Sequence, residues 1–326
     1  MKISVGIYPK DAPADVIVSG KLADEMGFSA LWVLDSHLLF HEVYTLLGAL
    51  AVSTRRIRLG TAVTNPLTRH PTVTASAFST LAELSGGRAM LGISVGDSAL
   101  KAMNRDIARM SVLAETVACC RKLLRGETVT LSDGTTAQLH HVGPPVPIYV
   151  AATGPRMLHL AGRIADGVIL MNGVAPELIA DAVDVVRQGE HAAARTKGSV
   201  KITVWAACHP SQEAVKFHVA RAILRNIPGR IDDLTRQVAA KVEQAYDFRQ
   251  HGSAQADFAR LIPDEIVARF AFTGDPVAIA RQVAALAPCG VDEVALAIPV
   301  APSIASRDVV MRELGPALLP MGAGRS

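Results

Sequence analysis

The feature that most constrains the fold is a regular alternation of short apolar runs with longer segments of helical period. The runs are apolar throughout, which is typical of strands that are buried on both faces of a parallel sheet. This order favours an α/β fold, a (β/α)8 TIM barrel, over the main alternative, a doubly wound sheet. The eight runs are Ile3–Tyr8, Ala30–Asp35, Ile57–Val63, Ala89–Val95, Pro147–Ala152, Gly167–Met171, Ile202–Cys208 and Glu293–Pro299.

The chain of 326 residues has the length of one such barrel, so we expect a single TIM-barrel domain over residues 1–326. Two insertions interrupt it, at about 126–147 and 211–263. In the first, Asp133-Gly134 between β-prone runs predicts a hairpin. The second follows the seventh strand and is expected to be helical. It either shapes a substrate pocket or forms an oligomer contact.

Composition excludes several functional classes. Lysine and arginine total 33 against 30 acidic residues, with no dense basic block, so we expect no nucleic-acid partner. The amino terminus lacks a signal-peptide core and no apolar run has the length of a membrane span, which predicts a cytoplasmic protein without membrane contact. The four cysteines form no Cys-x-x-Cys pair and are expected to be reduced thiols.

In such a barrel, functional residues lie just past the carboxyl ends of the strands. The residues there are small and polar, with no nucleophile elbow, and the histidine pairs are poorly spaced for a metal, so no metal is expected. A surface of this kind suits a cofactor that brings its own reactivity. The positions are Tyr8, Asp35, Ser36, His37, Thr64, Asn65, Gly96, Asp97, Ser98, Thr153, Gly154, Asn172, Gly173 and Pro299.

A second informative stretch runs from Tyr149 to Gly173. Small residues end a strand there, and Gly154-Pro155 open a helix with proline at a tolerated first position. Free backbone N–H groups at a helix start, with Arg156 nearby, suit a phosphate group. The alternative interpretation is that Gly154-Pro155 only separate a strand from a helix, as Gly-Pro pairs commonly do.

Two stretches together carry a resemblance: "VTNPLTRHPTVTASAFSTLAELSGGRAMLGISVGDSA" and "VPIYVAATGPRMLHLAGRIADGVI". They resemble the luciferase-like superfamily of flavin and deazaflavin oxidoreductases, and within it the F-420-dependent methylenetetrahydromethanopterin reductase group. "FTGDP" and "LAPCGVDEVALAIPV" follow in the family's order. The resemblance implies a barrel with the cofactor ring across its mouth. It also implies a bulge, often with a non-prolyl cis peptide, near Ala62-Val63, with Thr64 and Asn65 at the ring edge.

The same resemblance implies roles for the other candidates. Asp35 matches a carboxylate near the ring and would donate a proton or orient the cofactor, unless it only caps its loop. His37 would serve as a proton shuttle or be structural. The cofactor channel would be lined by Gly96, Asp97 and Ser98, and the phosphate would be held by Thr153, Gly154 and Arg156.

The chain departs from the reductases at Tyr8, where they carry a glutamate that is considered a catalytic acid. A phenol with a pKa near 10 does not replace a carboxylate near neutral pH without a large shift. The fold and the cofactor pocket can persist while the chemistry and the substrate differ. The methanopterin reductase activity itself is therefore not expected to follow from the resemblance.

Three functions remain open. The first is an F-420-dependent oxidoreductase that transfers hydride to or from a C=N, C=C or C=O group of a small molecule, with Asp35, Tyr8 or His37 supplying the proton. The second is an FMN-dependent monooxygenase served by a separate reductase, and the third is a non-catalytic barrel. The resemblance also favours a homodimer. Arg69, His70, Arg156 and Arg163 are candidates to bind the anionic tail of F-420.

Overall fold

A computed structural model describes residues 1–224, 231–246, 256–299 and 306–322. All eight expected strands are present in it, with ends within two residues of the predicted ones at most positions. They are β1 (Lys2–Ile7), β2 (Ala30–Val33), β3 (Arg58–Thr61), β4 (Ala89–Ile93), β7 (Ile148–Ala152), β8 (Gly167–Leu170), β9 (Lys201–His209) and β11 (Glu293–Ala297). No helix in the described ranges is long and apolar enough to cross a membrane.

The chain forms two compact units. One comprises Met1–Gly6, Ala152–Arg163 and Val168–Ser326, and the other comprises Ile7–Ala151 and Ile164–Gly167. We call them the first and the second unit. The expectation of a single domain stays a prediction.

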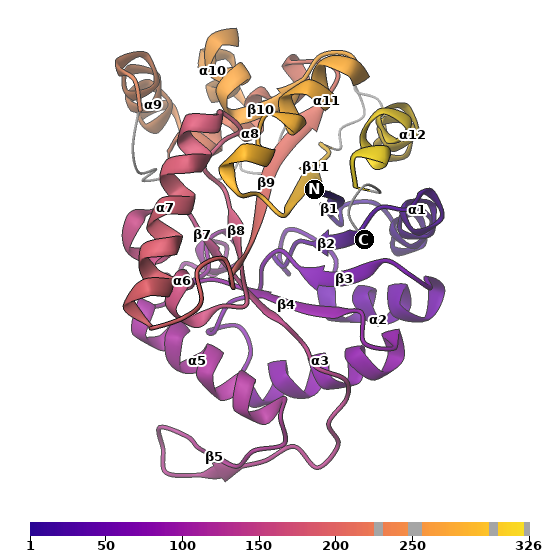
Figure 1. Cartoon of the computed structure of the whole chain (residues 1–326), viewed down its shortest axis with the longest axis vertical. Coiled ribbons are helices and arrows are strands. Elements are labelled where there is room, and N and C mark those ends of the chain that lie inside the picture. Colours follow the sequence, from indigo (N-terminus) through magenta and orange to yellow (C-terminus); the bar gives the residue numbers. More distant parts are fainter. Residues whose placement is uncertain (225–230, 247–255, 300–305, 323–326) are drawn as a thin grey trace. The chain divides into compact units, whose positions relative to one another are not determined.

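In the second unit, β2, β3, β4 and β7 form a parallel sheet in that order (Figure 1). Their residues are almost all buried, as the apolar runs predict. The strands pack closely where glycine replaces a side chain: a Cβ on Gly60 would lie 2.6 Å from the Trp32 ring. The helices of this unit are α1 (Pro13–Met26), α2 (Val43–Ser53), α3 (Pro71–Ser85), α4 (Ser98–Lys101) and α5 (Met110–Leu123).

Helix α1 ends at a glycine. Gly27 takes the left-handed conformation with a φ of 93°, and its N–H donates to the carbonyls of Ala23 and Asp24. Glycine reaches that conformation without a Cβ clash, which is why it commonly ends helices.

The predicted hairpin is confirmed. Strands β5 (Val129–Thr130) and β6 (Thr136–Ala137) are antiparallel, with Thr130 opposite Thr136. Gly134 has a φ of 84°, the left-handed conformation that a tight turn requires.

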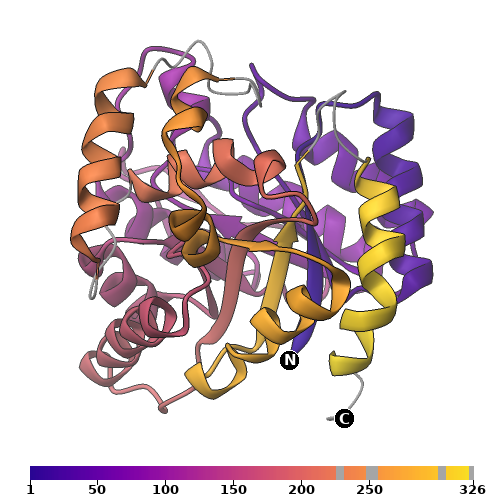
Figure 2. The same cartoon turned by 90° about the horizontal axis from the view of Figure 1, so that it is seen from above.

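In the first unit, the long strand β9 is parallel to β11, and β11 is parallel to β1. Figure 2 shows β9 and β11 side by side. A further strand, β10 (Ala271–Thr273), pairs with the end of β9 and was missed by the sequence analysis, because three residues directly after a helix give no strand period. The remaining helices are α6 (Pro155–Ile164), α7 (Pro176–Ala192), α8 (Glu213–Ile223), α9 (Asp233–Ala245), α10 (Asp264–Phe270), α11 (Pro276–Ala284) and α12 (Arg307–Leu318).

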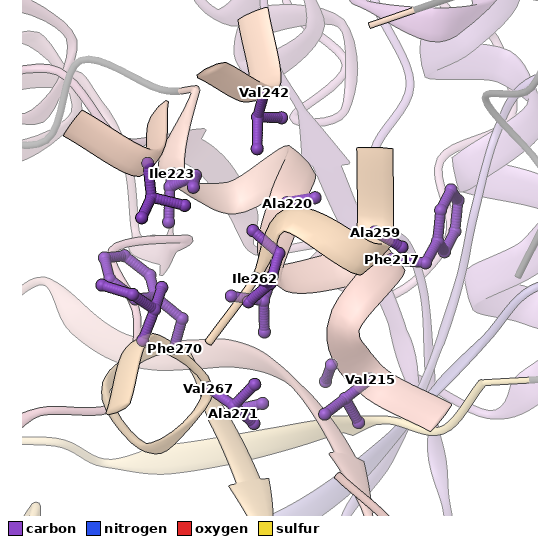
Figure 3. Close-up of a cluster of buried hydrophobic side chains, with 14 of the residues drawn as sticks. Val215, Phe217, Ala220, Ile223, Val242, Ala259, Ile262, Val267, Phe270 and Ala271 are labelled. Carbon is purple, nitrogen blue, oxygen red and sulfur yellow. The ribbon is translucent and has the colours of Figure 1, made fainter. Parts of the chain in front are cut away.

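The insertion after β9 is helical, as expected, over its described residues. Part of it, 225–230 and 247–255, lies outside the described residues. Its helices bury a common apolar cluster in the first unit, in which Val215, Phe217, Ile262 and Phe270 lie together (Figure 3). The same cluster includes Ala207 at the end of β9 and Ala271 of β10, so the insertion packs on these two strands. Burial of apolar surface stabilises by about 25 cal/mol per Å².

Candidate active site

The carboxyl ends of the strands of the second unit lie next to one another. The Leu34 N–H donates to the Ile7 carbonyl at 3.1 Å, and the Ala62 N–H donates to the Val33 carbonyl at 2.7 Å. Tyr8, Asp35 and Thr64 each follow one of these strand ends. The sequence prediction that the polar residues gather at one end of the strands therefore holds for this unit.

The peptide bond between Ala62 and Val63 is cis, which confirms the expectation at that position. Strand pairing resumes beyond it, where the Thr64 N–H donates to the Gly92 carbonyl at 3.0 Å and the Ser94 N–H donates to the Thr64 carbonyl at 3.0 Å. Ala62 and Val63 are half-buried, whereas Thr64 is fully buried. The bulge therefore interrupts β3 without detaching the residues that follow from β4.

Asp35 is the most unusual charged residue of the site. Its side chain is 1% exposed, and Oδ2 accepts a hydrogen bond from Arg69 Nη1 at 3.0 Å. Oδ1 is buried and accepts no hydrogen bond from the part of the chain that the structure describes. Burial raises the pKa of this carboxyl, and although Arg69 and the nearby Thr64 hydroxyl lower it, the pKa stays above its ordinary value.

Arg69 is held on three sides. Besides Asp35, its guanidinium donates through Nη2 to Glu42 and lies 4.0 Å from the centroid of the Tyr44 ring. Glu42 also accepts the N–H of Thr45 at 2.7 Å and thereby caps the start of α2. Two of its N–H donors are thus engaged by carboxylates, and the role of Arg69 towards a cofactor tail stays a prediction.

Tyr44 connects this charged group to the end of β3. Its hydroxyl donates to Thr64 Oγ1 at 3.1 Å, and its ring packs edge-on against Phe78 with the centroids 5.7 Å apart. Burial raises the pKa of Tyr44 to about 12, so the phenol remains a neutral donor at any physiological pH.

Asn65 shapes the loop that carries Arg69. Its Oδ1 accepts the backbone N–H groups of Leu67 and Thr68, both at 3.0 Å. Short polar side chains that bond two and three residues ahead stabilise turns of this kind. This arrangement matches the strand-ending turn that the sequence leaves open as the plainer role of Asn65.

The residues after β4 form a tight turn into α4. Gly96 has a φ of 93°, and a Cβ there would lie 2.5 Å from Leu100 Cδ1. Asp97 is half-exposed and pairs with Lys101 at 2.7 Å. Ser98 Oγ lies 2.5 Å from Ser36 Oγ, which links this turn to the loop after β2.

Tyr8 and His37 flank Asp35 along the chain. Tyr8 is buried and packs edge-on against Phe40, with the centroids 6.2 Å apart. His37 is half-buried and close enough to Asp35 to lower the pKa of that carboxyl through its charge. The structure thus places His37, a second predicted catalytic residue, close enough to Asp35 for the two side chains to interact electrostatically.

Thr153, Gly154 and Arg156 belong to the first unit, at the start of α6. The Thr153 carbonyl accepts Asn172 Nδ2 at 3.0 Å, and the Gly154 carbonyl accepts the Leu158 N–H at 2.9 Å. Arg156 is exposed and forms no ion pair with a carboxylate of the described residues. The helix start that was predicted at Gly154-Pro155 is confirmed, and its role towards a phosphate remains a prediction.

Sequence reasoning missed the ion pair of Asp35 and the residues that hold it. Arg69 was assigned to a cofactor tail, and Glu42 and Tyr44, which contact Arg69, were not candidates. Charge alone could have suggested that a buried aspartate needs a cation nearby. The choice among the chain's arginines depends on the path of the loop after β3, which spacing does not reveal.

Several known proteins are similar to this chain. Residues 2–293 match the profile of a family described as luciferase-like monooxygenase. The chain is 31% identical over 315 residues to the 5,10-methylenetetrahydromethanopterin reductase of Methanolobus tindarius, which covers 93% of this chain and 96% of that protein. It is 37% identical over 191 residues to the F-420-dependent glucose-6-phosphate dehydrogenase of Beutenbergia cavernae, which covers 53% and 56% of the two chains.

Among solved structures, the coenzyme F-420-dependent tetrahydromethanopterin reductase of Methanopyrus kandleri is similar with a TM-score of 0.79 at 24% identity. The match covers 98% of this chain and 99% of that one. It confirms the expected fold class, an α/β (β/α)8 TIM barrel of the luciferase-like type, and the helices α8 and α9 confirm the insertion after the seventh barrel strand.

Proposed function

Because the chain belongs to the luciferase-like monooxygenase family, we propose that it is an F-420-dependent oxidoreductase. It transfers hydride to or from a C=N, C=C or C=O group of a small-molecule substrate. The cofactor assignment is supported by a relative that is named as F-420-dependent, the dehydrogenase that is 37% identical over 53% of this chain. The acid chemistry is supported by one observation above the others, the buried Asp35 with an unpartnered Oδ1.

The residues of the second unit fit a planar cofactor with polar edges. Asp35 Oδ1 and Thr68 Oγ1 are buried without a hydrogen-bond partner among the described residues, and a polar ligand can satisfy such atoms. The half-buried bulge offers backbone for close approach. In the second unit, the residues that would hold the cofactor are Ala62, Val63, Thr64, Asn65, Gly96, Asp97 and Ser98. For Thr153, Gly154 and Arg156 of the first unit, a role in binding the cofactor's phosphate rests on the family resemblance alone.

When bound, a deazaflavin supplies hydride chemistry at its C5 position. The chain's own residues then supply a proton, and Asp35 is the main candidate because its raised pKa keeps part of the carboxyl protonated nearer to neutral pH. His37 can relay a proton between Asp35 and water. Tyr8 is assigned to the wall of the site, because its ring packs on Phe40.

The substrate is proposed to differ from that of the methanopterin reductases. Those enzymes resemble this chain over nearly its whole length, yet Tyr8 stands at the end of β1 where the family resemblance implies a glutamate. A neutral phenol there does not supply a second carboxyl acid. One carboxyl acid suffices for the reduction of a carbonyl or an imine, which is the reaction class that we favour.

A second candidate function is that of an FMN-dependent monooxygenase that uses reduced flavin from a partner reductase. The observation that favours it is the family description itself, luciferase-like monooxygenase. F-420 does not form the hydroperoxide that flavins use for oxygen transfer, so the identity of the cofactor decides between the two reactions. A single-domain homodimer in the cytoplasm completes the proposal.

The deciding experiment is a fluorescence titration of the purified apoprotein with F-420 and with FMN, each oxidised and reduced. Micromolar or tighter binding of F-420 with much weaker binding of FMN is the expected result. A preference for reduced FMN would replace the proposal by the monooxygenase. Binding of neither would remove both functions while leaving the fold untouched.

A further inference from the structure

Arg69 joins two carboxylates that differ greatly in burial. The Asp35 side chain is 1% exposed and the Glu42 side chain is 43% exposed. A guanidinium has five N–H donors and no acceptor, and it stays protonated in proteins. The Oδ2 atom of Asp35 therefore faces a permanent donor, Arg69 Nη1, at 3.0 Å.

This contact decides where a proton on Asp35 can reside. A hydrogen on Oδ2 would point at, or compete with, the N–H of Arg69, whereas Oδ1 accepts no hydrogen bond from the described residues. We propose that Arg69 is a positioning residue that confines the proton of Asp35 to Oδ1 and so makes Oδ1 the proton-donating atom of the site. The inference rests on the proposed function only for the identity of the proton acceptor.

The guanidinium is well placed for this role because it is fixed on its other sides. The Tyr44 ring lies 4.0 Å from Cζ, a cation–π contact, and Glu42 takes the second arm of the fork. The Tyr44 hydroxyl is in turn bound to Thr64 Oγ1 at 3.1 Å. Arg69 thus keeps one orientation towards Asp35 while the proton is transferred.

Charge balance within the group supports the same reading. With both carboxylates ionised, Asp35, Glu42 and Arg69 carry a net charge of minus one, and protonation of Asp35 leaves a neutral Glu42–Arg69 pair. Burial raises the pKa of Asp35 most, Arg69 lowers it, the Thr64 hydroxyl lowers it, Glu42 raises it, and His37 lowers it. Arg69 and Glu42 therefore act on Asp35 with opposite signs.

In the reductive direction, the O–H bond at Oδ1 breaks and its proton passes to the oxygen or nitrogen of the substrate. The hydride of the new C–H bond would be supplied by the reduced deazaflavin of the proposed function. Asp35 is left as a carboxylate, and Oδ1 takes a proton from water before the next turnover. Arg69 exchanges no proton in this cycle, which is why it positions rather than reacts.

The first test follows the protonation of Asp35 in the apoprotein, so it needs neither cofactor nor substrate. Carboxyl carbons of aspartate are labelled with ¹³C, and the Asp35 signal is assigned by its absence in Asp35→Asn. We expect Arg69→Gln to move the titration midpoint to higher pH, and Glu42→Gln to move it to lower pH. Glu42→Gln retains an oxygen that can accept the Thr45 N–H, so the start of α2 keeps its cap.

The matched control is Arg125→Gln. Arg125 follows α5, and its positively charged side chain is 64% exposed. This variant is expected to leave the Asp35 midpoint unchanged. Shifts of the same sign in the two test variants, or no shift in either, would overturn the proposal. If Arg69→Gln does not fold, Glu42→Gln carries the test alone, and a missing acid shift would overturn it.

The second test uses turnover once a substrate is found. Arg69→Gln should lower kcat about tenfold or more with little change in KM, because a misplaced proton affects the transition state. Arg69→Lys keeps a positive charge on a side chain that only donates hydrogen bonds. Compared with Arg69→Gln, it should restore the titration midpoint of Asp35 more completely than it restores kcat. A purely structural role predicts equal losses in both variants and an unchanged pH profile.

The two tests separate this inference from the proposed function. If the wild type turns over no reduced F-420 but the opposite midpoint shifts are found, the proposed function fails and the positioning role stands. If F-420 is turned over and the pH profile of kcat is the same in wild type, Arg69→Gln and Glu42→Gln, the positioning role fails and the function stands.

Discussion

Two buried aspartates of the second unit, Asp24 and Asp35, have opposite surroundings. Asp24 lies in the last turns of α1 and accepts three backbone N–H groups, from Arg55 at 2.8 Å, Arg56 at 2.9 Å and Ile57 at 2.7 Å. Asp35 follows β2 and accepts one hydrogen bond on Oδ2, while Oδ1 accepts none from the described residues. Both side chains are largely withdrawn from water.

The difference decides the direction of the pKa change. Burial raises the pKa of Asp24, but the three backbone donors and the charge of Arg56 outweigh it and leave the pKa lowered. For Asp35, burial outweighs Arg69 and the pKa is raised. A carboxylate whose two oxygens are both satisfied holds the fold together, whereas one with an unsatisfied oxygen is available for chemistry.

The largest expected effect that would sharpen this comparison is on turnover. Asp35→Asn should lower kcat about 10²- to 10⁴-fold, since it removes a transferable proton, and should change cofactor affinity by less than about tenfold. Asp24→Asn should leave kcat per folded molecule nearly unchanged. Steady-state kinetics with reduced F-420 and fluorescence titration measure the two quantities. Unchanged turnover in Asp35→Asn would remove Asp35 from the catalytic residues.

The next largest effect is on stability, and here the Asp24 variant is expected to lose more than the Asp35 variant. Asp24→Ala leaves three buried backbone N–H groups without their acceptor and should lower the free energy of unfolding by about 3 kcal/mol or more. Asp35→Asn should lower it much less, because the amide oxygen still accepts from Arg69. Urea unfolding of the apoprotein compares them. A loss below about 1 kcal/mol in Asp24→Ala would show that these bonds are replaced by water.

The pH dependence of stability should differ in sign between the two aspartates. The pKa of Asp35 is higher in the folded state than in the unfolded state. Its contribution to the free energy of unfolding is therefore greatest below the unfolded-state pKa of about 3.9, and it is lost as pH rises through the folded-state pKa. The pKa of Asp24 is lowered, so its contribution is present above about pH 3.9 and is lost as pH falls.

Urea unfolding over a pH series tests this with Asp35→Asn and Asp24→Asn as references. The wild type should lose stability relative to Asp35→Asn as pH rises from about 4. It should lose stability relative to Asp24→Asn as pH falls below about 4. The prediction would be contradicted if the stability difference between wild type and variant changed with pH in the same direction for Asp35→Asn and Asp24→Asn.

The smallest expected effect concerns the neutral hydrogen bond beside Asp35. Tyr44→Phe removes the donor to Thr64 Oγ1 but keeps the ring under Arg69, so it should lower the free energy of unfolding by about 1 kcal/mol. Thermal unfolding with urea unfolding as a check is sufficient to detect it. A loss as large as that of Asp24→Ala would mean that the Asp35 region is as much a structural element as the Asp24 region.

Much of the fold could be predicted because it depends on local rules. The eight apolar runs, the Asp133-Gly134 hairpin and the helix start at Gly154-Pro155 all follow from burial period and from residues with restricted or unusual backbone angles. Strand β10 escaped prediction because three residues have no readable period, and its existence depends on pairing with β9.

The site could be predicted only in part. Position after a strand end correctly brought Asp35 and Thr64 to one region, and the family resemblance correctly located the cis peptide at Ala62-Val63. Arg69, the ion-pair partner of Asp35, lies in the loop after β3, and Glu42, which also binds Arg69, lies at the start of α2. They are separated from Asp35 by 34 and 7 positions in the sequence. Their contact depends on how two loops fold over one another.

By itself, the sequence determined the order of strands and helices and the kind of residue at each strand end, because burial period and backbone preference act over a few neighbouring positions. It did not reveal the different hydrogen-bond surroundings of Asp24 and Asp35, which are both single aspartates near the end of a regular element. Only the tertiary structure decided that three backbone donors surround Asp24, and that Arg69 and the Thr64 hydroxyl lie beside Asp35. The protonation of a buried carboxyl depends on every group within a few ångströms, and those groups are brought together only by folding.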